Sequence, residues 1–119
     1  MKLKTALIYV KDLDRMAAFY NRVLGLKPVN ETRTDTWVEF EAGGARLALH
    51  AIPTAIAELI EIASPPEARE DMPIKLIFAV EDLDAECDSL SSSGVPLTRR
   101  PWGAADGLDP EGNVFQIST

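Results

Sequence analysis

The sequence predicts an α+β fold built from a duplicated unit, and two observations support this prediction. First, residues 9–14 (YVKDLD) return in the second half as a near copy, residues 79–84 (AVEDLD). Second, alternating apolar residues lead into each copy, and apolar residues at helical spacing follow each copy. We therefore expect two related strand–helix units in one chain.

Length and composition fit one compact domain or two small modules that share a core. The chain has 119 residues, of which 46% are hydrophobic and 26% are charged. Its formal net charge of −7 leaves no basic stripe for phosphate groups, so we expect no nucleic-acid partner and no membrane partner. The single cysteine, Cys87, rules out an intramolecular disulfide, and no signal-type or membrane-spanning apolar run is present. These features predict a cytoplasmic protein.

The first unit begins with a strand, a capping residue and a helix. Residues 3–10 alternate apolar side chains with others and predict a strand. Asp12 can accept hydrogen bonds from the first turn of a helix that we expect over residues 13–24. Gly25 follows this helix, as glycine commonly does at a helix end. Residues 27–32 are expected to form a second strand.

A hairpin closes the first unit. Gly43-Gly44 separates the alternating runs 37–42 and 45–50, and this pattern is a strong hairpin signal. The register that follows pairs Ala42 with Ala45, Glu41 with Arg46, Glu39 with Ala48, and Trp37 with His50. One face is then apolar and packs under the helix, whereas the other carries charges, an aromatic ring and the only histidine. We expect Glu41 and Arg46 to form a cross-strand charge pair.

The second unit follows a connector that contains a short amphipathic helix starting near Pro53. A strand over residues 74–80, an Asp82 cap and a helix over residues 83–92 repeat the earlier order. Three shorter strands are then expected at residues 96–100, 104–108 and 113–118. Residues 109–113 (DPEGN) are rich in turn-forming residues and predict a turn that joins the last two of these strands.

Several of these motifs together resemble the vicinal oxygen chelate superfamily of glyoxalases, bleomycin-resistance proteins and extradiol dioxygenases. They are the Val-x-Asp-Leu-Asp turn, Phe19-Tyr20, residues 23–26 (VLGL), Trp102-Gly103 and residues 109–113. The resemblance covers nearly the whole chain and implies a single domain over residues 1–119. It implies two βαβββ modules in tandem, at about residues 1–51 and 73–119 with a connector at about 52–72. Their curved mixed sheet would form a cleft, and the chain would form a homodimer.

The resemblance also implies where a divalent metal would be held in catalytic members. Carried over position by position, the four ligand positions fall on Thr5, Ala48, Lys75 and Gln116, and a register slip of two would replace Ala48 by His50. Ala48 has no donor atom, and Lys75 would place a positive charge beside a cation. Thr5 and Gln116 are weak neutral ligands where these metals prefer imidazole or carboxylate. We therefore expect no tightly bound metal and no other cofactor, with a displaced divalent-metal site as the alternative.

Strand parity predicts which side chains line the cleft. The expected ligand pocket consists of Thr5, Tyr9, Trp37, Glu39, His50, Lys75, Trp102 and Gln116. Trp102 lies in a turn, where we expect its ring chiefly to cover the core of the second unit and secondarily to form part of the pocket wall. Aromatic walls with a few polar groups are typical of a small-molecule site.

His50 and Glu39 are the candidate catalytic residues. They could act as an acid–base pair or hold a displaced metal ion. In the structural alternative His50 is a hydrogen-bonded framework residue, and Glu39 is an exposed strand residue or pairs with Lys75. Lys75 could instead bind an anionic group or extend into water.

Three functions remain open at this point. The leading one is binding of a small organic molecule without metal, in the style of the bleomycin-resistance proteins. The second is a metal-dependent glyoxalase-like lyase or dioxygenase that uses His50, Glu39 and Gln116. The third is a protein with a vestigial pocket whose role is association.

Overall fold

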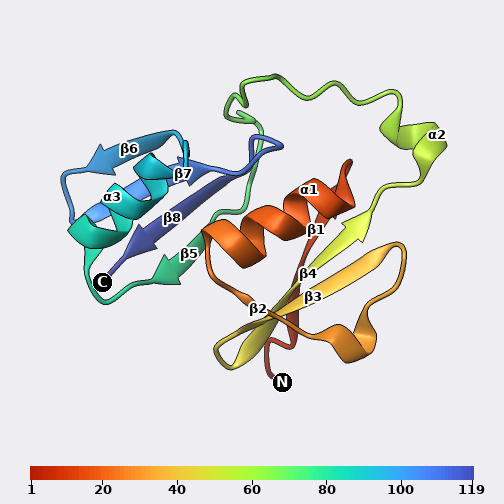
Figure 1. Cartoon of the computed structure of the whole chain (residues 1–119), viewed down its shortest axis with the longest axis horizontal. Helices are drawn as coiled ribbons and strands as arrows, with labels where there is room; N and C mark the ends of the chain where they lie inside the picture. The colour runs from red at the N-terminus through yellow and green to blue at the C-terminus, as the bar shows by residue number, and fades with distance from the viewer. The chain divides into compact units, whose positions relative to one another are not determined.

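The computed structural model describes residues 1–119, which form two compact units, Met1–Glu61 and Ile62–Thr119. Each unit contains a strand, a helix and three further strands in that order, and the strands of each unit form one four-stranded sheet. Figure 1 shows the main helix of each unit lying across one face of its own sheet. The prediction of an α+β fold with two βαβββ modules is confirmed.

The first unit has a mixed sheet with the strand order β1-β4-β3-β2, in which β1 is parallel to β4 and the other pairs are antiparallel. Its elements are β1 (Thr5–Val10), α1 (Leu13–Ala18), the π-helix η1 (Phe19–Val23), β2 (Lys27–Pro28), the 3-10 helix η2 (Asn30–Thr32), β3 (Trp37–Ala42), β4 (Ala45–Ala51) and α2 (Thr54–Ala57).

The hairpin register of β3 and β4 is the one that the sequence predicts, from Ala42 opposite Ala45 to Trp37 opposite His50. Because side chains alternate along a strand, this register sends one apolar set toward α1. Val38, Phe40, Leu47 and Leu49 are all buried. They pack with Met16 and Tyr20 of the helical segment, which are also buried. The opposite face carries Glu39, Arg46 and His50 together with the exposed side chains of Leu7 and Tyr9.

Two elements of the first unit differ from expectation. The helix changes to π-helical geometry after Ala18, where the N–H of Leu24 donates to the carbonyl of Phe19. This wider turn accompanies the burial of two adjacent rings, Phe19 and Tyr20. The expected strand over residues 27–32 ends at Pro28, because the chain turns into η2, where the Arg33 N–H donates to the Asn30 carbonyl at 3.2 Å.

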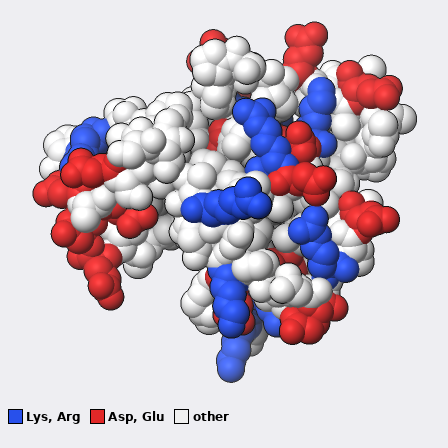
Figure 2. Space-filling view, viewed as in Figure 1, with Lys and Arg blue, Asp and Glu red and all other residues white.

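The second unit repeats this topology. Its elements are β5 (Leu76–Ala79), α3 (Leu83–Ser92), β6 (Leu97–Arg100), β7 (Ala104–Leu108) and β8 (Val114–Ser118), with the strand order β5-β8-β7-β6. Cys87 and Leu90 of α3 are buried, and the Phe115 ring covers Gly107 so closely that a β-carbon there would meet the ring at 2.5 Å. The outer side of α3 is acidic, as Figure 2 shows.

Both predicted helix caps are present. The Asp12 carboxylate accepts a hydrogen bond from the Arg15 N–H at 3.1 Å, and the Asp82 carboxylate accepts one from the Ala85 N–H at 3.0 Å. Each cap satisfies a backbone donor that the first helical turn would otherwise leave free. None of the helices is both long and apolar enough to cross a bilayer.

The closing turn after β7 is built around Asp109. One oxygen of its carboxylate accepts hydrogen bonds from the N–H groups of Glu111 and Asn113, at 2.9 and 3.0 Å. Gly112 has a φ of +81° and lies against the backbone of Glu67, so that no side chain fits there. The Arg69 N–H donates to the Gly112 carbonyl at 3.0 Å. The end of the connector is therefore attached to the second unit.

Candidate functional site

Each unit leaves one sheet face uncovered by its main helix, and a buried carboxylate lies near the middle of that face. In the first unit the register aligns Leu7, Ala48 and Glu39 across β1, β4 and β3. In the second unit it aligns Ile77, Gln116 and Asp106 across β5, β8 and β7. Glu39 and Asp106 therefore occupy equivalent positions on the third strand of their modules. Both carboxylates are buried, so each requires a partner.

Arginine neutralises the first carboxylate. Arg46 donates from Nη1 to Oε2 of Glu39 at 2.8 Å, and the Thr32 hydroxyl donates to the same oxygen at 3.2 Å. The hydrogen bond from Arg46 lowers the pKa of Glu39 below its ordinary value, although burial opposes this, and Trp37 and Thr32 add to the lowering. Glu39 is therefore held as an anion that is already paired.

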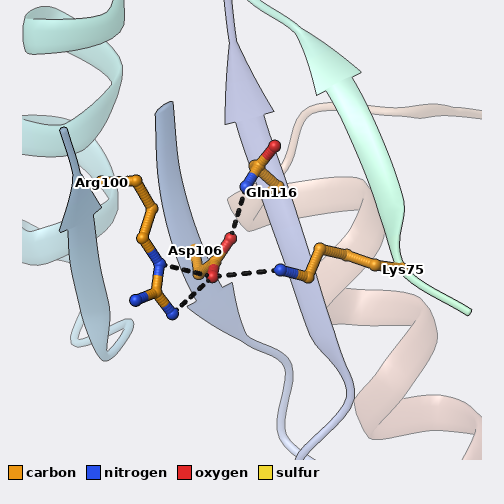
Figure 3. A network of polar contacts seen from close by, with 4 residues as sticks. All are labelled: Lys75, Arg100, Asp106 and Gln116. Atoms are coloured by element: carbon orange, nitrogen blue, oxygen red, sulfur yellow. Dashed lines mark hydrogen bonds and ion pairs between the residues drawn. The ribbon is translucent and has the colours of Figure 1, made fainter. Parts of the chain in front are cut away.

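The second carboxylate has three partners, drawn in Figure 3. Arg100 donates from Nε to Oδ2 of Asp106 at 2.8 Å and places a terminal nitrogen 2.8 Å from the same oxygen. Lys75 donates to Oδ2 at 3.2 Å, and Nε2 of Gln116 donates to Oδ1 at 2.8 Å. We call these four residues, Lys75, Arg100, Asp106 and Gln116, the Asp106 cluster.

The Asp106 cluster keeps its carboxylate ionised in spite of burial. Burial by itself would raise the pKa of Asp106, since it removes water from the charged form. Hydrogen bonds from Gln116, Arg100 and Lys75 together outweigh this effect and lower the pKa below its ordinary value. The cluster thus contains one anion and two cations, and its net charge is positive.

Three aromatic rings meet on the uncovered face of the first unit. The Tyr9 and His50 rings stack with centroids 5.6 Å apart, and the Trp37 ring meets His50 edge-on, also at 5.6 Å. The three residues lie side by side on β1, β4 and β3 because Tyr9 and Trp37 are both register partners of His50. Such a group offers flat apolar surface with polar atoms at its edges.

Comparison with protein-family models shows which family has this architecture. Residues 2–117 match the model described as the glyoxalase/bleomycin resistance protein/dioxygenase superfamily. The chain belongs to this superfamily. No relative was found among curated proteins.

Solved structures of this superfamily share the fold. A glyoxalase/bleomycin resistance protein/dioxygenase family enzyme from Burkholderia phytofirmans PsJN is 25% identical, with 98% of this chain and 97% of that chain covered and a TM-score of 0.75. Lactoylglutathione lyase from Agrobacterium tumefaciens is 22% identical, with coverages of 98% and 92% and a TM-score of 0.68. TnmS3, an antibiotic binding protein from Streptomyces sp. CB03234, is 22% identical, with coverages of 99% and 94% and a TM-score of 0.67.

Where the sequence resemblance would place metal ligands, the residues of this chain are poor donors for a divalent metal ion. Ala48 has no donor, and the amide nitrogen of Gln116 is turned toward Asp106, as in Figure 3. Lys75 brings an ammonium group to its position. No three His, Cys, Asp or Glu side chains come together as a metal ion would require. The nearest carboxylates, Glu39 and Asp106, lie one strand away and already pair with arginine.

The structure places the expected pocket residues in two groups. Tyr9, Trp37, Glu39 and His50 lie on the uncovered face of the first unit, where Thr5 is the register partner of Arg46. Lys75 and Gln116 meet at Asp106 in the second unit, and Trp102 is exposed in the turn after β6.

Two ion pairs differ from those that the sequence suggests. Arg46 was expected to pair with Glu41, its cross-strand neighbour, but its side chain reaches the buried Glu39 instead. Lys75, the alternative partner of Glu39, pairs with Asp106. A buried carboxylate gains more from a charged partner than an exposed one does, which explains both choices.

Asp106 and Arg100 are site residues that the sequence reasoning missed. The internal repeat contains the signal that would have found Asp106, because matching β8 to β4 puts Asp106 at the position of Glu39. Arg100 carries no such signal, since its position in the repeat falls in the η2 region of the first unit rather than on a strand.

Proposed function

We propose that this protein binds a small organic molecule and does so without a tightly held divalent metal. One observation carries the proposal: in both modules the carboxylate nearest to the superfamily's metal position is buried and already paired with arginine. Binding a cation there would require breaking a hydrogen-bonded ion pair in a partly dry site, which is costly. The aromatic group around His50 in the first unit and the Asp106 cluster in the second unit are each a candidate binding surface within their own unit.

The fold is compatible with such a role. TnmS3, which shares it, is an antibiotic binding protein. A ligand with a flat ring would stack on Tyr9, His50 and Trp37, since aromatic faces favour offset or edge contacts with other rings.

A metal-dependent lyase or dioxygenase is the competing function, and lactoylglutathione lyase shares the fold. In that case His50, Glu39 and Gln116 would have to act around a displaced ion. Glu39 would first have to leave Arg46, and none of its hydrogen bonds goes to His50. The paired state of Glu39 favours the binding function.

Metal content separates the two functions. Untagged protein is analysed for metal before and after incubation with nickel, zinc, manganese and ferrous iron, together with His50→Ala and Glu39→Ala. We expect no ion to be retained after desalting. About one ion per chain, lost in either variant, would overturn the proposal and direct the work to lyase and dioxygenase substrates.

Ligand binding itself is tested by thermal shift. A ligand at one hundred times its Kd stabilises the folded protein by about 2.7 kcal/mol, so a library of small organic molecules should contain compounds that raise the unfolding temperature. If no compound does so, the pocket is vestigial and the proposal fails.

Two further properties belong to this proposal. We infer a homodimer, because large apolar side chains remain exposed outside the candidate binding surfaces, among them Leu59 and Ile74. We also infer a cytoplasmic location, which the free and buried thiol of Cys87 supports.

A further inference from the structure

The Asp106 cluster has an unbalanced charge on the uncovered face of the second sheet. Lys75 and Arg100 form ion pairs with Asp106 and with no other acidic side chain. Two cations therefore share one anion, and one positive charge is left over in a chain whose net charge is −7. A local positive charge attracts negatively charged ligands.

Hydrogen-bond donors are also left over. The Lys75 ammonium has three N–H groups and uses one of them on Asp106. Arg100 directs Nε and one terminal nitrogen to Asp106, so its Nη1 group donates to no protein acceptor. The two side chains are 40% and 39% exposed, so these donors are accessible to a ligand.

The buried carboxylate of Asp106 holds both cations in place. Asp106 is 7% exposed on β7, and the Gln116 amide occupies its second oxygen. Because Lys75 and Arg100 contact the same oxygen, their charged ends lie close together, as Figure 3 shows. Cations that are fixed before a ligand arrives lose less side-chain entropy when it binds.

Apolar surface lies beside the two cations. Ile77 is 60% exposed, and the register places it in the same row as Gln116 and Asp106. The Trp102 ring is 66% exposed and has the Arg100 guanidinium 6.0 Å from its centroid. If a ligand binds the two cations through an anionic group, the apolar part of the same ligand would lie close to Ile77 and Trp102.

We propose that Lys75 and Arg100 form an anion subsite that binds the carboxylate of an organic monoanion, with Asp106 as the positioning residue. A carboxylate carries the single negative charge that balances the cluster, and it can accept hydrogen bonds from Lys75 and Arg100 at once. This inference rests on the proposed binding function and names the chemical class of its ligand.

The test compares an aryl carboxylate with its neutral isostere. Full-length protein labelled with nitrogen-15 is titrated with 1-naphthoate and with 1-naphthamide while amide and arginine side-chain resonances are recorded. We expect saturable shifts at Arg100 Nε and at the amides around Lys75, Ile77 and Gln116. The naphthamide should bind about tenfold more weakly or worse, because it cannot take the charge-assisted hydrogen bonds.

A matched pair of variants tests whether naphthoate binds at Arg100. Arg100→Gln should weaken naphthoate binding about tenfold, whereas Arg99→Gln should leave it unchanged. Arg99 is the neighbouring residue on β6, and it forms an ion pair with Asp84 of α3 instead of with Asp106. If Arg100→Gln fails to fold, the comparison of naphthoate with naphthamide on the natural protein still decides the question.

Three outcomes would overturn the inference. Equal binding of naphthoate and naphthamide would show that the charge is not recognised, and the absence of shifts at these residues would show that the subsite is not used. Tighter binding of 1-naphthyl phosphate than of naphthoate would assign the cations to a dianion. A neutral compound that raises the unfolding temperature without shifting the Asp106 cluster would leave the proposed function standing and remove this subsite alone.

Discussion

Asp106 is the residue whose protonation state matters most for the second unit. Its carboxylate is buried, and it accepts hydrogen bonds from Lys75 just before β5, from Arg100 of β6 and from Gln116 of β8. Its pKa lies below the ordinary value of 3.8. A group whose pKa is lower in the folded state stabilises the fold above its ordinary pKa. This stabilisation decreases as the pH falls below the ordinary pKa, and it is lost once the pH has passed through the lower pKa of the folded state.

Asp106→Asn should therefore lower the free energy of unfolding at neutral pH by about 1–3 kcal/mol, since two cations lose their buried partner but can still reach water. The difference from the natural protein should narrow below about pH 3.8, because the carboxylate becomes protonated there in the unfolded chain and, at still lower pH, in the folded protein. Urea unfolding across the acid range measures both effects.

Asp84→Asn is the matched control for this substitution. Asp84 also pairs with an arginine, but its side chain is 83% exposed, so its loss should cost less than about 0.5 kcal/mol. An equal loss in the two variants, or a constant difference at all pH values, would contradict the role assigned to Asp106.

At the scale of elements, the closing turn between β7 and β8 depends on Gly112. This residue combines a φ of +81° with a close approach to the backbone of Glu67, and its carbonyl accepts the Arg69 N–H. The turn therefore joins the connector to the second sheet through backbone contacts, which a side chain at this position would displace.

Gly112→Ala should lower the free energy of unfolding by about 3 kcal/mol or more, because the backbone must shift in addition to the strain of positive φ. Gly43→Ala isolates the strain alone, since Gly43 has a φ of +74° with nothing within 4 Å of an added β-carbon. That variant should lose about 1–2 kcal/mol. Equal losses in urea unfolding would show that the contact with Glu67 is not important.

At the scale of the whole molecule, the two units have separate sheets and separate cores but leave one face of each sheet without its own helix. Exposed apolar side chains also remain elsewhere in the chain, including Leu59 and Ile74. Apolar surface of this kind is commonly covered by association.

We therefore expect the protein to elute as a homodimer. Light scattering coupled to size exclusion should give about twice the chain mass of 13.0 kDa at micromolar concentrations. A mass of one chain that does not change with concentration would contradict the inferred homodimer, without bearing on the ligand subsite in the second unit.

Much of the fold could be predicted from the sequence because its signals are local. The helix over residues 83–92 and the strand over residues 104–108 have the predicted bounds. Capping aspartates, two-residue periodicity and the Gly43-Gly44 turn act over a few positions, and the structure confirms each of them. The strand predicted over residues 27–32 was too long because residues 30–32 form a 3-10 turn, closed by the Arg33 N–H and the Asn30 carbonyl, in place of sheet hydrogen bonds.

Local sequence patterns were enough to predict the duplication, the superfamily resemblance, the hairpin register and the face that carries Glu39 and His50. Which charges meet depends on the folded arrangement of the strands. Asp106 joins Lys75, Arg100 and Gln116 because β8 lies between β5 and β7, and β6 lies beside β7. This strand order is set by packing between distant segments. Arg46 likewise reaches Glu39 rather than its direct neighbour Glu41 because Glu39 is the buried carboxylate, and burial is a property of the folded chain that periodicity along the sequence does not contain.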